Sequence, residues 1–521
     1  MRTLTSKQIL LFWLVVNLII HLIFNSLWSF HRDELLYLAL GRRLDWGYAS
    51  VPPGIGFWAW IGEHFLGGSV WAIRLIATLF GIATVGLTGL MAEEMLPQKH
   101  PAIKSHLWLI GMAGLCCGAF LRPAMLFMPV VFDIFYWTLI SYLLLRYINS
   151  QQVQWLLWLG LATGLGLLNK YTIFIQLFAL IPGLTFTPLR QIFREPKLYL
   201  AMGIALLVFS PNIYWQIEHG LPLFQHFGAL AESQFAHVTP GGFLADQLQF
   251  FLPVLPVWLA GLYFLLFRQE ASQWRVFGWM FVCTLAVLLY FSAKSYYSLG
   301  AYPVLIAAGA SFLTGLSQNR HRWIRWGLLG WMLLFGAMTI PAALPIFGPE
   351  KEAAVVQKLV QLPGMDGILR WEDGKYHTLP QDFADMIGWE ELGLQMGKIW
   401  QADPDKSTAY IYADNYGQAG AIEHFGRIYG VPEVWSFSDN YQYWLPEAPP
   451  PGLKTFYYVN DELGDDMPGF FQNIDKIWEL DMPLSRQHGV QIYRCTQPTP
   501  AFFERIGKAI QSVKTHQPIE D

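Results

Sequence analysis

Residues Trp28–Gly54 read WSFHRDELLYLALGRRLDWGYASVPPG and overlap the end of the apolar segment 9–30. An apolar segment of that length can cross a bilayer. Acidic and bulky residues follow it instead of a small-residue cleavage site, so we expect an uncleaved first span. Ionisable groups at membrane depth are costly unless they have a partner or a task. The stretch therefore predicts a membrane protein whose first loop carries part of a functional site.

The composition indicates a polytopic membrane protein. Of 521 residues, 54% are hydrophobic and only 14% charged. A net charge of −4 gives no support for a nucleic-acid partner, and four cysteines are too few for a disulfide framework. Hydropathy predicts about eleven spans, roughly at 9–30, 69–91, 105–121, 130–148, 155–169, 172–188, 198–216, 243–267, 275–292, 299–315 and 323–345.

The placement of cations predicts the orientation of these spans. With a cytoplasmic N-terminus, the cytoplasmic face carries Arg2, Lys7, Lys99, Lys104, Arg146, Arg190, Arg194, Lys197, Arg268, Arg275, Arg320, Arg322 and Arg325. The opposite face carries only Arg32, Arg42, Arg43, Arg122, Lys170 and Lys294. Because short cytoplasmic loops are enriched in Lys and Arg, an odd number of spans places the C-terminus outside.

The composition becomes polar near Pro349, which predicts a transmembrane domain over 1–347 and an external α/β domain over 348–521. STAYIYA, TFYYVN and GVQIYRC are predicted strands at 407–413, 455–460 and 489–495. DNYGQAGAIEHFG is a predicted helix capped by Asp414 or Asn415.

Charged residues at the external ends of several spans predict a shared site. Asp33 and Glu34 end the first span, Asp133 begins the fourth, Lys170 ends the fifth and Lys294 follows the ninth. A carboxylate can take the proton of an acceptor hydroxyl that attacks a sugar carbon. Cations can neutralise the phosphate that leaves. This chemistry suits sugar transfer from a lipid-linked phosphate without a nucleotide or an obligatory metal, although the paired acids leave room for a weakly bound divalent cation.

The first loop, 31–68, also predicts two short interfacial helices, at 35–43 and 56–68. Such helices can wall a groove that admits a prenyl chain, with Pro52 and Pro53 forming the corner between them.

Each of these residues also has a purely structural interpretation. Asp33, Glu34 and Asp133 can cap helices, and cations at span ends can be topological anchors. In the C-terminal domain, core or loop packing competes with sugar stacking for Trp435, Tyr441, Tyr443 and Trp444.

The stretch RDELLYLALGRRLDWGYASVPPG resembles the first external loop of bacterial relatives of protein O-mannosyltransferases and of the lipid A aminoarabinose transferase. These are GT-C membrane glycosyltransferases of the PMT-like family, glycosyltransferase family 39. Further matching segments occur in the same order: 71–81, 129–148, 160–172, 210–226, 293–310 and YADNYGQAGAIEHFG in the C-terminal part.

The resemblance implies an inverting glycosyltransferase at the periplasmic face of a bacterial inner membrane. Its donor would be a polyprenyl-phosphate sugar, with undecaprenyl phosphate the usual carrier, and its acceptor a glycan, lipid or protein hydroxyl. Asp33 is then the expected base, with Glu34 and Asp133 supporting the acceptor site. The expected phosphate-binding residues are Lys170, Lys294, Tyr296, Tyr297, Arg32 and Arg74.

One departure from the family pattern concerns the residues before Pro-Pro. Many relatives have Asp-His there, whereas this chain has Ser50 and Val51, so no role of that histidine in sugar choice is carried over.

Two other classes of function stay open at the level of sequence. A transporter or flippase of lipid-linked sugars tends to place charges near the middle of the membrane and to show repeated halves, which this sequence does not. A membrane-anchored glycan sensor would use the external domain and would need far fewer spans.

Overall fold

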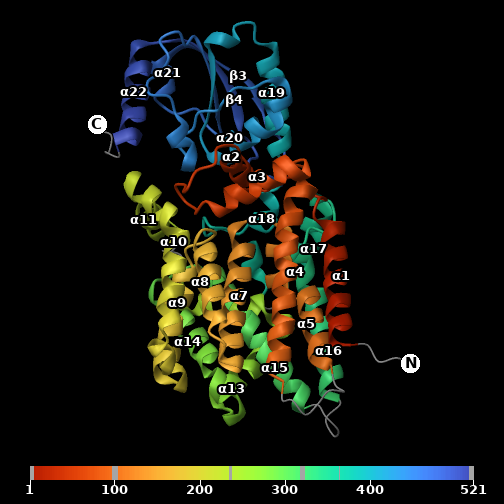
Figure 1. Ribbon diagram of the computed structural model, residues 1–521. Helices are drawn as coiled ribbons and strands as arrows, with labels where there is room; N and C mark the ends of the chain where they lie inside the picture. The colour runs from red at the N-terminus through yellow and green to blue at the C-terminus, as the bar shows by residue number, and fades with distance from the viewer. Residues whose placement is uncertain (1–4, 97–103, 234–237, 317–322, 363, 516–521) are drawn as a thin grey trace.

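A computed structural model describes residues 5–96, 104–233, 238–316, 323–362 and 364–515. A helical bundle forms the larger part of the molecule, and a small sheet with its helices lies above one end of it (Figure 1). Among the described residues, the helices long and apolar enough to cross a membrane are α1 (Ser6–Phe24), α4 (Val70–Glu94), α7 (Pro129–Ser150), α10 (Pro196–Glu218) and α16 (Trp323–Ala343). Two more candidates include the 3-10 helix that precedes them, namely Gln269–Tyr290 with α14 (Arg275–Tyr290) and Ser295–Leu316 with α15 (Tyr302–Leu316).

The other apolar helices are bent or short. The three bent pairs are α5 (Ser105–Cys116) with α6 (Gly118–Met125), α9 (Ile173–Phe186) with the 3-10 helix Pro188–Arg194, and α12 (Pro240–Phe250) with Leu252–Phe267, which includes α13 (Leu255–Phe267). The shorter apolar helix is α8 (Gln154–Leu167), and α11 (Pro222–Ser233) follows α10. The described residues thus contain seven candidate spans, or up to ten if each bent pair is one span, fewer than the eleven or so predicted, because α8 at the predicted span 155–169 is too short to count. The fold class of a polytopic helical protein with a C-terminal α/β region is confirmed. Arg2, Lys99, Arg320 and Arg322 lie outside the described residues.

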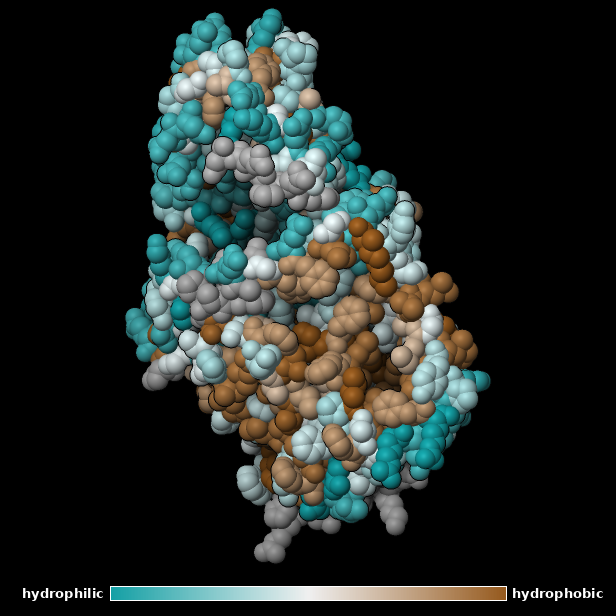
Figure 2. Space-filling view, turned by 90° about the vertical axis from the view of Figure 1, so that its left-hand side faces the viewer, coloured by the Kyte–Doolittle hydropathy of each residue, from teal (hydrophilic) through white to brown (hydrophobic). Residues whose placement is uncertain are grey.

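Large apolar side chains cover the outside of the bundle. On α10, Leu206 and Leu207 are 60% and 73% exposed, and on α14 Tyr290 is 83% exposed. Figure 2 shows hydrophobic residues across the middle of one face, with hydrophilic residues above them and at the lower edge. Such a surface suits contact with lipid, because the bilayer then covers apolar side chains that would otherwise be exposed to water.

The first span ends earlier than predicted. Helix α1 stops at Phe24, six residues before the expected end at residue 30. The reason is the guanidinium of Arg74 in α4. It donates hydrogen bonds of 2.7–3.1 Å to the backbone oxygens of Asn25, Trp28 and Ser29, which would otherwise accept from helical N–H groups. Carbonyls that accept from a buried guanidinium are satisfied without helix, so the chain is free to turn here.

The first loop contains the two predicted helices, α2 (Arg32–Arg42) and α3 (Gly54–Leu66). Their environments differ. Helix α3 keeps Phe57 and Phe65 exposed, as an interfacial helix would, whereas every residue of α2 from 34 to 41 is buried. Helix α2 lies between the bundle and the sheet region (Figure 1), so its predicted place at the lipid interface is corrected.

The C-terminal region is built on a four-stranded mixed sheet. Its order is β1 (Ala409–Ala413), β2 (Thr455–Asn460), β4 (Gln491–Pro498) and β3 (Phe471–Glu479), with β1 and β2 parallel and the other pairs antiparallel. One face packs on α19 (Trp389–Ala402) and α20 (Tyr416–Phe425). The other face packs on α22 (Pro500–Thr515), with α21 (Met467–Phe470) preceding β3. The three predicted strands are confirmed, and β3 was missed because its side chains are mostly polar and exposed.

Helix α20 begins as predicted and packs closely on α2. The side chain of Asn415 accepts from the backbone N–H groups of residues 417 and 418 and so caps the helix. Glycine permits the contact with α2: a Cβ on Gly420 would lie 3.0 Å from the backbone carbon of Leu35. The contact is also polar, because the Arg43 guanidinium donates to both carboxylate oxygens of Glu423, at 2.9 and 3.0 Å.

The aromatic residues of this region pack in the interior. Tyr441 is 1% exposed and donates to Glu423, while the Arg43 guanidinium lies 4.2 Å from the ring centre of Trp444. This geometry favours the packing interpretation of these side chains over sugar stacking.

The chain between the last span and the sheet lies against the bundle. It contains α17 (Pro349–Leu359) and α18 (Gln381–Ala384), and Phe383 packs with Trp28 and Leu126 of the bundle. Residues 349–387 therefore contact the membrane part, although the sequence grouped them with the C-terminal domain.

Close packing of α2 and α20 makes a prediction for stability. We expect Gly420→Ala to destabilise the protein by about 1–3 kcal/mol, because the added methyl group overpacks the contact with Leu35. The measurement is thermal unfolding of the purified protein in detergent. Gly452→Ala is the matched control, since a Cβ there meets nothing within 4 Å. An unchanged melting temperature for Gly420→Ala would show that the two helices are not held this closely.

Candidate active site

A single large cavity lies between the end of the bundle and the sheet region. It has a volume of about 1230 Å³ and is lined by side chains from the first loop, the bundle, the segment 365–385 and the C-terminal region. Leu36 and Tyr37 of α2 form part of its wall, and Phe174, Phe224 and Phe227 add apolar surface. Polar groups converge at the end of the cavity near α2, so the cavity suits a ligand with an apolar chain and a charged head.

Asp33 lies at this polar end, in the first turn of α2. Its Oδ1 accepts a hydrogen bond of 2.7 Å from the hydroxyl of Tyr416, the first residue of α20. The Arg32 guanidinium lies 4.3 Å from the centre of the Tyr416 ring. Asp33, Arg32 and Tyr416 all line the cavity.

Glu34 and Arg74 form a buried ion pair instead of lining the cavity. Both side chains are fully buried, and Arg74 Nη2 lies 2.7 Å from Glu34 Oε2. The Glu34 carboxylate also accepts from the backbone N–H of His31 and of Phe127, each at 2.8 Å. This geometry gives Glu34 and Arg74 a supporting place beneath the site, with no direct access to a ligand in the cavity.

Lys170 lies at the α8–α9 connection, near Asp133 of α7. Lys170 lines the cavity, and its Nζ lies 5.0 Å from the ring centres of both Tyr296 and Tyr297. Asp133 is 2% exposed and accepts from the hydroxyl of Thr172 at 2.6 Å. Burial lowers the pKa of Lys170, which Lys294 also favours, while the charge of Asp133 opposes this shift. Among the described residues no carboxylate pairs directly with Lys170, so its ammonium is available to an anion.

Lys294 also lies near Tyr296. Its Nζ is 5.8 Å from that ring centre and 3.2 Å from Oε1 of Glu372. Two lysines therefore lie near one tyrosine at the cavity wall. An anion close to both ammonium groups would offset their mutual repulsion.

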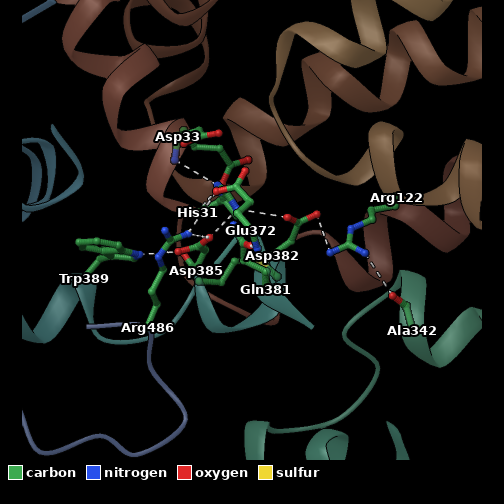
Figure 3. A network of polar contacts seen from close by, with 12 residues as sticks. His31, Asp33, Arg122, Ala342, Glu372, Gln381, Asp382, Asp385, Trp389 and Arg486 are labelled. Carbon is green, nitrogen blue, oxygen red and sulfur yellow. Dashed lines mark hydrogen bonds and ion pairs between the residues drawn. The ribbon is translucent and has the colours of Figure 1, made fainter. Parts of the chain in front are cut away.

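A network of charges from the segment 381–385 closes the site beside Asp33 (Figure 3). Asp382 pairs with Arg122 of α6, and Asp385 lies 3.1 Å from Arg486. His31 lies between the two acids, with its Nε2 3.9 Å from a carboxylate oxygen of each. The other ring nitrogen of His31 accepts the backbone N–H of Asp33 at 3.0 Å, so it caps α2.

The charges of this network respond differently to their surroundings. Burial raises the pKa of Asp385, against the opposing effects of His31 and Arg486. Burial also acts on Asp382, but Arg122 and His31 outweigh it and hold the pKa of this carboxyl below its usual value. Asp382 is thus the better-compensated anion of the two.

The structure brings together six of the nine residues predicted for the site. Asp33, Arg32, Lys170, Lys294, Tyr296 and Tyr297 line the cavity, and Asp133 lies directly behind its wall next to Lys170. Glu34 and Arg74 do not line it. The prediction missed the contributions of the later chain, namely Glu372, Asp382, Asp385, Tyr416, Asp439 and Arg486. For Glu372, Asp382 and Asp385 the only sequence signal was the acidic run in the polar segment 372–385, which no span end marks.

The first comparison with known proteins concerns sequence. Residues 50–215 match the family described as dolichyl-phosphate-mannose-protein mannosyltransferase. This segment runs from the end of the first loop through α10 and includes Asp133 and Lys170. This segment of the chain is thus similar to PMT-like membrane glycosyltransferases. No curated protein matches the chain.

The second comparison concerns structure and shows that the fold of this chain is similar to that of ArnT. Two crystal structures of ArnT from Cupriavidus metallidurans, one in the apo state and one bound to undecaprenyl phosphate, align with 93% of this chain and 97% of theirs. The TM-scores are 0.60 and 0.61, at 14% sequence identity. At this identity the similarity establishes the fold of both the bundle and the C-terminal region.

No metal centre is evident within the described ranges of the chain, where no group of three or more His, Cys, Asp or Glu side chains is placed to hold an ion. The expectation of a metal-independent reaction stays a prediction.

The buried ion pair yields a prediction that separates support from catalysis. We expect Glu34→Gln to destabilise the protein by about 3–5 kcal/mol, because it leaves the fully buried Arg74 without a counter-ion. The measurement is the yield and thermal stability of the purified variant. Glu63→Gln, which removes the part-exposed partner of Arg42, is the control and should cost about 1 kcal/mol or less. A normally stable Glu34→Gln variant would argue against a structural role.

Proposed function

We propose that this chain transfers a sugar from a polyprenyl-phosphate donor to a hydroxyl acceptor, with inversion at the anomeric carbon. The observation that carries the proposal is a cavity lined both by the carboxylate of Asp33 and by two lysines, Lys170 and Lys294. The ArnT structure of the same fold that contains undecaprenyl phosphate supports this class of donor.

The two ends of the cavity suit the two ends of the donor. The lysines and the hydroxyls of Tyr296 and Tyr297 would bind the phosphate, and the apolar wall near Phe224 and Phe227 would contact the prenyl chain. The donor phosphate then lies at the level of Tyr296, with the sugar directed toward α2. Charge that develops on the leaving phosphate is stabilised because the ammonium groups are already in place.

Asp33 would act as the general base. The acceptor hydroxyl gives its proton to the Asp33 carboxylate while its oxygen forms a bond to the anomeric carbon. The bond from that carbon to the phosphate oxygen breaks, and its electron pair stays on the phosphate. Attack from the side opposite to the leaving group inverts the configuration. General-base assistance of this kind contributes about 10²- to 10⁴-fold to a rate.

The positions of the charged residues also support a sidedness for the reaction. Arg146 pairs with Glu94 at the end of α4 that is far from the cavity. The cavity residues Asp33 of α2 and Tyr416 of α20, by contrast, belong to helices at the end that carries the sheet region (Figure 1). We therefore propose that transfer takes place at the periplasmic face of a bacterial inner membrane, with the acceptor a glycan, lipid or protein.

The function is tested with purified protein and a panel of radiolabelled undecaprenyl-phosphate monosaccharides, with a cell-envelope extract as the source of acceptors. We expect label to move from one of these donors to the extract, and nuclear magnetic resonance of the product to show inversion. If none of the donors transfers its label, the proposal is overturned. Uptake of an intact donor into vesicles without transfer would favour a transporter.

The base is tested by Asp33→Asn. We expect this variant to fold and to lose transfer by about 10²- to 10⁴-fold, because an amide cannot accept the proton of the acceptor. Initial rates with the active donor provide the measurement. Asp45→Asn changes an exposed aspartate of the same loop and should retain full activity. Full activity of Asp33→Asn would remove the proposed base.

The phosphate site is tested by Lys294→Met. We expect the dissociation constant for undecaprenyl phosphate to rise about tenfold, the effect of losing one charge-assisted hydrogen bond to a phosphate. Titration calorimetry with the lipid in detergent measures it. Lys358→Met alters an exposed lysine of α17 outside the cavity and serves as the control. Equal affinity of Lys294→Met and the wild type would contradict the phosphate role.

A further inference from the structure

Tyr416 brings the C-terminal region into direct contact with the proposed base. Its hydroxyl donates to Oδ1 of Asp33 at 2.7 Å, across 383 positions of sequence. Within the described part of the chain, no hydrogen bond reaches the other carboxylate oxygen of Asp33. One oxygen of the base is therefore held and the other is left to the cavity.

The position of Tyr416 is determined by the packing of α20 on α2. A Cβ on Gly417 would lie 2.7 Å from Cγ of Arg32, so glycine is needed directly after the tyrosine. The Asn415 cap fixes the first turn on the other side. The ring of Tyr416 is held as well, because the Arg32 guanidinium lies 4.3 Å from its centre. Gly417, Asn415 and Arg32 thus hold Tyr416 in the position from which its hydroxyl reaches Asp33.

We propose that Tyr416 is a positioning residue for the transfer reaction, which fixes the Asp33 carboxylate so that Oδ2 is presented to the acceptor hydroxyl. This inference rests on the proposed function. A carboxylate with one oxygen hydrogen-bonded cannot rotate about its Cβ–Cγ bond without losing that bond, so the free oxygen stays in one direction. Free rotation of the base would lower the rate of transfer, because the reacting groups must be aligned within a few tenths of an ångström.

The proton balance assigns no transfer to the tyrosine. The acceptor proton moves to Oδ2 of Asp33, the acceptor oxygen bonds to the anomeric carbon, and the phosphate leaves with the electron pair. Tyr416 keeps its own proton throughout and acts through Asp33. The Arg32 cation over the ring strengthens the phenol as a donor, because it withdraws electron density from the hydroxyl.

Tyr416→Phe tests the role of the hydroxyl with little change in shape. We expect kcat to fall roughly 10- to 100-fold, the size of one hydrogen bond to a charged group. The dissociation constant for undecaprenyl phosphate and the melting temperature should stay unchanged, because the lysines and the ring remain. Activity is measured with the undecaprenyl-phosphate sugar that the wild type uses and the same envelope extract.

A double-variant cycle separates positioning from general support of the fold. If Tyr416 acts only through the Asp33 carboxylate, the change Tyr416→Phe should not lower the residual activity of Asp33→Asn any further. The matched control is Tyr441→Phe, which removes a buried hydroxyl bonded to Glu423 at the same contact between α2 and the C-terminal region. This control should retain the wild-type kcat.

The outcomes distinguish the inference from the function on which it rests. A wild type that transfers sugar together with a Tyr416→Phe variant of equal kcat overturns the positioning role alone. So do additive losses in the double variant, or a loss of lipid binding in step with the loss of rate. A wild type without transfer from any donor overturns the proposed function and this inference together.

Discussion

The buried ion pair of Arg74 and Glu34 determines where the site can form. Arg74 ends the first span by taking the carbonyl groups that would have continued it, and Glu34 accepts backbone N–H groups from the start of α2 and from the loop between α6 and α7. Three segments distant in sequence are thus joined at one guanidinium and one carboxylate. Asp33 precedes Glu34 in the first turn of α2, so the direction of its side chain follows from this arrangement. Because removal of either charge leaves the other buried and uncompensated, the pair specifies one geometry more than it adds net stability.

The charged side chains that line the cavity are stabilised in two ways. At its phosphate end, Lys170 and Lys294 lie near aromatic faces, which offer a cation weak stabilisation and leave it able to bind an anion. Beside them, Asp382 and Asp385 are each paired with an arginine, Arg122 and Arg486, so these charges are compensated within the protein. Lys294 is paired with Glu372, whereas Lys170 has no carboxylate partner of this kind among the described residues. A ligand anion therefore gains most by binding near Lys170. The apolar side chains of the wall, such as Phe224 and Phe227, suit the chain of a lipid.

The sequence was informative where a physical rule ties residue type to place. Hydropathy located the spans, alternation located β1, β2 and β4, and the cost of charge in a membrane located Asp33, Lys170 and Lys294. It failed where side chains meet only through tertiary packing. Glu34 and Arg74 were expected to face a ligand because a charge near a span end does not reveal its partner. Tyr416 was missed for the same reason, because the packing of a C-terminal helix on the first loop leaves no periodic pattern in the residues between them. The glycines of YGQAG did indicate a close helix contact, but the sequence does not say which segment they contact.

The glycine-lined crossing of α2 and α20 constrains how proteins of this fold can exchange their parts. The two helices are encoded near opposite ends of the chain, yet a Cβ on Gly420 of α20 would lie 3.0 Å from the backbone carbon of Leu35 of α2. A C-terminal region taken from another protein of this fold would fit this bundle only if its counterpart of α20 offered equally small residues at the crossing. Side chains away from the crossing would therefore change more readily than whole modules could be exchanged.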